Sequence, residues 1–79
     1  MAKADNVRIG TIKWLNRDTK DGIISQEDGD DVYFRLGDIV KGIAMAEEGQ
    51  LVQFIKQMTD IGPRALEITI LGRIKGLIK

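Results

Sequence analysis

Few side chains in this 79-residue chain could do covalent or acid–base chemistry, because the sequence contains neither cysteine nor histidine. Those two residues are the usual thiolate nucleophile and the commonest general base, and both are frequent metal ligands. No base–nucleophile pair and no glycine-rich phosphate loop stands in their place. We therefore expect a binding module rather than an enzyme, with no catalytic residue and no cofactor.

The acidic stretch EDGDD, Glu27 to Asp31, could suggest a calcium site, because aspartate carboxylates ligate that ion. Its spacing does not match an EF-hand loop, and the pair Asp28-Gly29 is typical of a tight turn between two strands. We therefore predict a solvated hairpin tip and no metal.

Trp14 is the more informative residue. It lies in the stretch GTIKWLNRDTKDGIIS, residues 10–25, where a strand, a turn and a second strand are expected, at a position that the first strand should show to solvent. A partly buried packing role is the alternative for this side chain. The residues around it are aliphatic or acidic rather than aromatic.

Charge is unevenly distributed along the chain, although twelve basic and twelve acidic residues balance overall. Residues 9–71 contain seven basic and eleven acidic side chains, a net charge of −4, and the two ends together carry +4. Attraction to a phosphate backbone would then depend on a local patch or on the termini. The sequence shows neither a membrane-spanning apolar run nor a secretory signal, so we expect a cytoplasmic protein with no membrane partner.

Five strands separated by turn residues are expected to hold these side chains in place, in one domain over residues 1–79. The longest connection, residues 37–50, has room for a helical turn but not for a full helix. The pattern predicts an all-β, five-stranded antiparallel barrel over residues 8–71. A basic and apolar C-terminal extension, GRIKGLIK, follows at residues 72–79. The expected strands cover residues 7–15, 22–25, 32–36, 51–58 and 64–71.

Five segments of the chain (KWLN, DGIIS, DVYFRL, EGQLVQF and GPRALEITIL) resemble the cold-shock domain family, in matching order from about Ile9 to Leu71. The resemblance implies a five-stranded OB-type barrel that binds single-stranded RNA or DNA, often as an RNA chaperone or antiterminator. In that family, aromatic side chains on two adjacent strands, the two ribonucleoprotein motifs, make the contact.

The motif positions transfer only in part. Lys13 and Trp14 match the family's lysine and tryptophan, Tyr33 keeps an aromatic position, and Arg35 stands at a histidine position. Phe34 and Phe54 fall at core positions. Several other residues stand where the family has phenylalanine, namely Leu15, Asp21, Ile23, Leu36 and Ile43. The candidate nucleic-acid-binding residues are Lys13, Trp14, Ile23, Tyr33, Arg35, Lys56 and Arg64.

Strand geometry predicts which of these residues are neighbours. If the hairpin centres on Asp28, Ile23 lies opposite Tyr33 and Asp21 lies opposite Arg35, all on the outer face. Ile24, Val32 and Phe34 then point into the core. We expect Asp21 and Arg35 to form a cross-strand ion pair, which would add repulsion toward phosphate and little stability.

Two functions remain open from the sequence. The first is a single-stranded RNA- or DNA-binding module whose binding is weakened or altered because most stacking aromatics are replaced. The second is a homodimer or protein-docking module, because the replacements Leu15, Ile23, Leu36 and Ile43 would keep the surface apolar. In this second case the segment RIKGLIK could add a strand to an open edge.

Overall fold

Alternation of apolar and polar residues builds the long strands of this chain. The computed structural model describes residues 7–27 and 29–73. Each strand buries one face, as in β3, where Val32 and Phe34 are buried and Tyr33 and Arg35 are exposed. The strands are β1 (Val7–Asn16), β2 (Asp21–Ser25), β3 (Val32–Arg35), β4 (Ile39–Lys41), β5 (Gln50–Thr59) and β6 (Gly62–Arg73).

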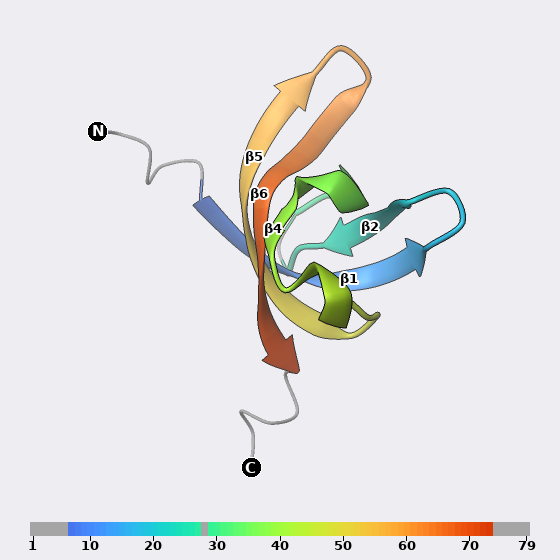
Figure 1. Ribbon diagram of the computed structural model, residues 1–79. Helices are drawn as coiled ribbons and strands as arrows, with labels where there is room; N and C mark the ends of the chain where they lie inside the picture. Colours follow the sequence, from blue (N-terminus) through green and yellow to red (C-terminus); the bar gives the residue numbers. More distant parts are fainter. Residues whose placement is uncertain (1–6, 28, 74–79) are drawn as a thin grey trace.

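These strands form one sheet in the order β3-β2-β1-β5-β6-β4, and a further pairing of β3 with β6 closes it into a barrel (Figure 1). The predicted closed barrel of five strands is confirmed, and a sixth, three-residue strand, β4, is added to it. Its closure differs from the purely antiparallel arrangement that we expected, because β3 and β6 meet in parallel, at Tyr33 and Arg64. The β5–β6 hairpin extends beyond the barrel at its turn (Figure 1).

The long connection contains more structure than the sequence predicted. Two short 3-10 turns, η2 (Leu36–Asp38) and η3 (Ile43–Met45), flank the three-residue strand β4. This sixth strand pairs in parallel with β6 and buries Ile39 against the core. The two turns agree with the helical turn for which the sequence left room, but a three-residue strand offers too little alternation to be recognised.

The core lies inside the barrel and contains both phenylalanines, which are almost fully buried. Ile24, Val32 and Phe34 all have a relative exposure of 0%, as the alternation predicted. A Cβ placed on Gly22 would lie 2.3 Å from the carbonyl oxygen of Trp14 and 2.7 Å from the Phe34 ring. Glycine at this position therefore lets β2 approach both neighbours. The largest fully buried side chains are Ile12, Ile24, Val32, Phe34, Val52, Phe54 and Ile68.

The register of the β2–β3 hairpin is as predicted. Ile23 pairs with Tyr33 and Asp21 pairs with Arg35. The centre of the turn, Asp28, lies outside the described residues. The C-terminal extension expected at residues 72–79 begins as strand, because β6 continues to Arg73 and pairs it with Gln50. Residues 74–79, which include most of the segment RIKGLIK expected to add a strand in the second function, lie outside the described part of the chain.

Within residues 7–27 and 29–73, no helix is both long enough and apolar enough to cross a membrane.

Candidate nucleic-acid interface

Four candidate residues lie side by side across the outer surface of the barrel. β1 pairs Trp14 with Ile23, β2 pairs Ile23 with Tyr33, and β3 pairs Tyr33 with Arg64. Trp14 is 43% exposed and Tyr33 is 37% exposed, and Ile23 lies half-buried between them. We call Trp14, Ile23, Tyr33 and Arg64 the outer row. It presents two aromatic rings with one aliphatic side chain between them and a cation at one end.

A β-bulge in β1 puts a cation beside the tryptophan. The register shifts between Ile12 and Trp14, so that Lys13 is the extra residue opposite β2. Strict alternation would turn Lys13 and Trp14 to opposite faces, but both are exposed here. Lys13 Nζ lies 2.8 Å from Asp31 Oδ2, and both side chains remain about half exposed. The bulge therefore gives the outer row a lysine whose charge is partly balanced by Asp31.

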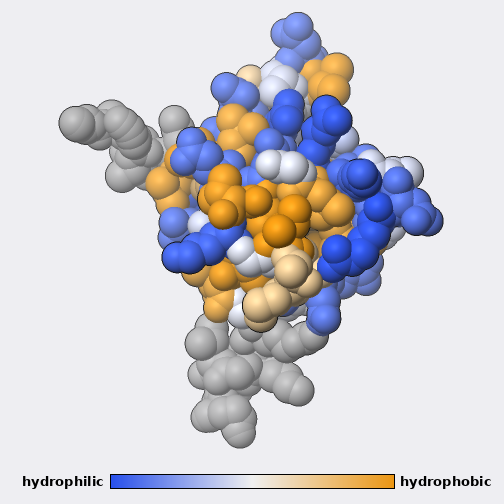
Figure 2. Space-filling view, viewed as in Figure 1, coloured by the Kyte–Doolittle hydropathy of each residue, from blue (hydrophilic) through white to orange (hydrophobic). Residues whose placement is uncertain are grey.

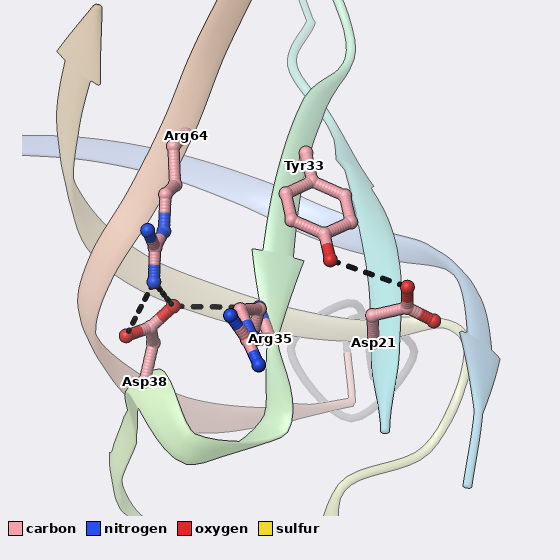
Figure 3. Close-up of polar contacts among 5 residues, drawn as sticks. All are labelled: Asp21, Tyr33, Arg35, Asp38 and Arg64. Atoms are coloured by element: carbon pink, nitrogen blue, oxygen red, sulfur yellow. Dashed lines mark hydrogen bonds and ion pairs between the residues drawn. The ribbon is translucent and has the colours of Figure 1, made fainter. Parts of the chain in front are cut away.

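The predicted ion pair between Asp21 and Arg35 is wrong, although the two residues are in register. The Asp21 carboxylate instead accepts a hydrogen bond from the Tyr33 hydroxyl, at 3.2 Å, and another from the Thr19 hydroxyl. Figure 3 shows the Tyr33 hydroxyl directed across the hairpin at Asp21. Two hydroxyl donors thus occupy the carboxylate, and the Arg35 guanidinium has no hydrogen bond or ion pair with another described residue.

Arg64 is held on the other side of β3 by an aspartate that the sequence did not single out. Its Nη2 lies 3.2 Å from Asp38 Oδ2, and the same carboxylate oxygen accepts the backbone N–H of Arg35 at 3.4 Å (Figure 3). The buried Nε of Arg64 has no hydrogen-bond partner among the described residues. Asp38 therefore joins η2, β3 and β6 at the point where the barrel closes.

A groove of about 670 Å³ opens beside Tyr33 and Arg35. Its other wall is the β5–β6 turn, where the Ile61 side chain is 92% exposed. Sequence reasoning missed this wall and the role of Asp38, because the closure that brings residues 59–64 to β3 links segments far apart in the chain. The groove is lined by Tyr33, Arg35, Thr59, Asp60, Ile61, Gly62, Pro63 and Arg64.

Lys56 is the candidate that the structure does not bring to the outer row. It lies half-buried on β5 opposite Ala65 and lines a separate hollow with Arg8, Ile9 and Glu27. Neither Trp14 nor Tyr33 lines that hollow. We therefore remove Lys56 from the candidate interface.

The aliphatic replacements do not form one exposed apolar surface, so that expectation is also wrong. Leu36 is only 8% exposed, because η2 turns it into the core, and Leu15 packs against the same core. Ile43 remains on the surface at 46% exposure. Only Ile23 and Ile43 of the four contribute to the outer surface.

No group of three or more acidic residues in the described ranges is arranged to hold a metal ion.

Comparison with known proteins defines the class of this barrel. A family model described as the 'Cold-shock' DNA-binding domain matches residues 8–71. Cold shock protein 1 of Lactiplantibacillus plantarum is 42% identical over 60 residues, which cover 75% of this chain and 91% of that protein. The chain therefore belongs to the cold-shock domain family, a nucleic-acid-binding, non-enzymatic family, as its motifs predicted.

Two further relatives show how much of the chain this relationship covers. The major cold shock protein of Streptococcus pyogenes serotype M1 is 41% identical over 64 residues, 80% of this chain and 96% of that protein. A cold shock-like protein of Aquifex aeolicus is 37% identical over 65 residues, which cover 80% of this chain and 93% of that protein. The chain thus spans nearly the full length of these relatives.

Proposed function

We propose that this chain binds single-stranded RNA or DNA across the outer row, acting in the cytoplasm as an RNA chaperone or regulator. The observation that carries the proposal is the register itself. It places Trp14, Ile23, Tyr33 and Arg64 in one line across four strands, with both aromatic side chains exposed. Exposed rings in a line can stack successive bases of one strand.

Binding through this row is weaker, or differently specific, than binding through a fully aromatic surface. Each base stacked on an aromatic side chain contributes roughly 1–3 kcal/mol. Asp21 and Ile23 stand where the family resemblance implies phenylalanines, so two stacking surfaces are replaced. Trp14 and Tyr33 remain, and the planar guanidinium of Arg35 can stack on a further base.

Electrostatic attraction is local in this proposal. Lys13 and Arg35 are exposed beside the row, and Arg64 ends it. Residues 9–71 carry a net charge of −4, so the body as a whole does not attract phosphate. We expect few phosphate contacts and a correspondingly shallow dependence of affinity on salt concentration.

Trp14 is the only tryptophan, and its fluorescence provides the test. Titration with a short oligothymidylate or oligouridylate should quench this fluorescence, and quenching should weaken as salt rises. Tyr33→Ala should weaken binding by about 5- to 150-fold through the loss of one stacked base. Ile9→Ala, at an exposed site off the row, is the matched control and should bind like the parent chain. An unchanged signal at roughly tens of micromolar oligonucleotide would contradict the proposal.

A second candidate function, a homodimer or protein-docking surface, has one specific observation in its favour. Figure 2 shows an apolar area over β4 and η3. In this segment Val40 is 66% exposed, Ile43 46% and Met45 65%. Exposed apolar patches often mark protein interfaces. A dimeric mass in light scattering that becomes monomeric in Val40→Ser/Met45→Ser would favour this function.

A further inference from the structure

We propose that the groove beside Tyr33 selects a guanine base in the bound single strand. This inference rests on the proposed function and adds a base preference to it. Two features of the groove carry it. The β3 side of the groove presents a guanidinium with unused donors, Arg35, and the β5–β6 turn that also lines the groove carries a carboxylate, Asp60.

The Arg35 guanidinium is free to read a base. The side chain is exposed, and its planar fork of N–H donors makes no hydrogen bond or ion pair with a described residue. Arg64, by contrast, is held by Asp38 at 3.2 Å. Asp38 also accepts the Arg35 backbone N–H, so the start of the Arg35 side chain is fixed while its end stays available.

Guanine matches both walls of the groove. Its N7 and O6 form an adjacent pair of acceptors, which is the partner that an arginine fork binds with two hydrogen bonds. Its N1–H and N2–H groups form an adjacent pair of donors, which suits a carboxylate such as that of Asp60. Adenine offers no acceptor pair, and thymine and uracil alternate acceptors with a donor. Cytosine has an acceptor pair but no donor pair.

Tyr33 supplies a surface on which the purine can stack. Its ring lines the groove, and its hydroxyl is tied to Asp21 at 3.2 Å, which restrains the ring on the outer face. Gly62 and Pro63, at the start of β6, line the same groove without a charged group. A base stacked on Tyr33 would thus have its edges near a donor fork and a carboxylate.

The first experiment compares short oligothymidylates that carry guanine, adenine or cytosine at one central position, with Trp14 fluorescence as the readout. We expect the guanine oligonucleotide to bind about 5- to 100-fold more tightly than the others. Equal affinities would overturn the guanine preference and leave the proposed function standing. Binding of none of them would overturn both. If the chain is instead a homodimer or protein-docking module, none of the oligonucleotides should bind.

Modified bases then identify the edge that is read, without changing the protein. Replacing guanine by 7-deazaguanine removes the N7 acceptor, and replacing it by hypoxanthine removes the N2 amino donor. Each change should weaken binding by about 3- to 10-fold, because each removes one hydrogen bond. Unchanged binding of both analogues would overturn the two-wall geometry.

Arg35→Lys tests the fork, because lysine keeps the positive charge but cannot form the paired contact. This variant should lose most of the preference for guanine over thymine, measured as the ratio of the two affinities, because a lost stacking contact would weaken both oligonucleotides alike. Arg8→Lys is the matched control, since Arg8 is exposed and lines a different hollow. A preference that survives Arg35→Lys unchanged would overturn the assignment of Arg35.

Discussion

The inner and outer faces of the β2–β3 hairpin follow different rules. On the inner face, Ile24, Val32 and Phe34 are completely buried, as the alternation of the two strands predicts. On the outer face, Asp21 and Ile23 stand where the family resemblance implies stacking aromatics. In these short strands, the inward-facing residues maintain the barrel, and the outward-facing residues next to them alter the binding surface. Because strand neighbours point to opposite sides, the binding face can diverge while the core stays intact.

The largest expected effect tests this separation of the two faces directly. Phe34→Ala removes a fully buried ring and should lower the free energy of unfolding by about 3–5 kcal/mol. Tyr33→Ala, one residue away on the outer face, should cost only about 1 kcal/mol. Urea denaturation followed by circular dichroism measures both. Equal losses would mean that the outer face also carries the stability of the fold.

Gly22→Ala should destabilise the fold by adding a methyl group where β2 packs closely against its neighbours. The added methyl group would meet the Trp14 carbonyl and the Phe34 ring, and such overpacking costs about 1–3 kcal/mol of unfolding free energy. Gly37→Ala is the control, because no atom lies within 4 Å of its added Cβ. Thermal unfolding of the two variants should separate them, and a Gly22→Ala chain as stable as Gly37→Ala would contradict the tight contact.

Ile23→Phe should sharpen the comparison by restoring a ring between Trp14 and Tyr33. One more stacked base should tighten oligothymidylate binding by roughly 1–3 kcal/mol. The unfolding free energy should stay nearly the same, because the side chain is on the outer face. Ile9→Phe adds the same ring away from the outer row and should leave affinity unchanged. Equal gains in both variants would point to nonspecific apolar binding.

The smallest expected effect separates the contact that forms from the one that does not. A double-mutant cycle with Asp21→Ala and Tyr33→Phe should give a coupling energy of about 0.2–1 kcal/mol, because it removes an exposed hydrogen bond. A cycle with Asp21→Ala and Arg35→Ala should give a coupling near zero. A larger coupling in the second cycle than in the first would restore the ion pair that the structure replaces.

Local patterns were enough to predict a closed barrel, the buried face of the β2–β3 hairpin and the register of that hairpin, but not β4 or the parallel closure. Alternation identified Phe34 as buried and Tyr33 as exposed, and the hairpin turn set which residues face each other. The same register did not predict the partner of Asp21, because side-chain choice among neighbouring donors depends on rotamers and not on strand spacing. Thr19 and Tyr33 both reach the carboxylate.

The groove could not be predicted from the sequence, because it depends on barrel closure. Arg64 could be read only as a loop or motif residue until β6 met β3, and Asp38 had no recognisable partner. Lys13 was a candidate through the family resemblance alone, because strict alternation would turn it away from Trp14. A bulge adds one residue to a strand without a clear sequence signal, so the shared exposure of Lys13 and Trp14 required the structure.

The closure of the barrel also has a consequence for its motions. β3 and β6 meet at one residue pair, Tyr33 with Arg64, supported by the Arg64–Asp38 contact. Because this junction between β3 and β6 has so few backbone hydrogen bonds, separating the two strands there should cost less free energy than opening the barrel elsewhere. A bound nucleic-acid strand that lies across Tyr33 and Arg64 would contact both β3 and β6 where the barrel closes. Amide hydrogen exchange in β3 and at the start of β6 should therefore slow on binding more than in β1 or β5.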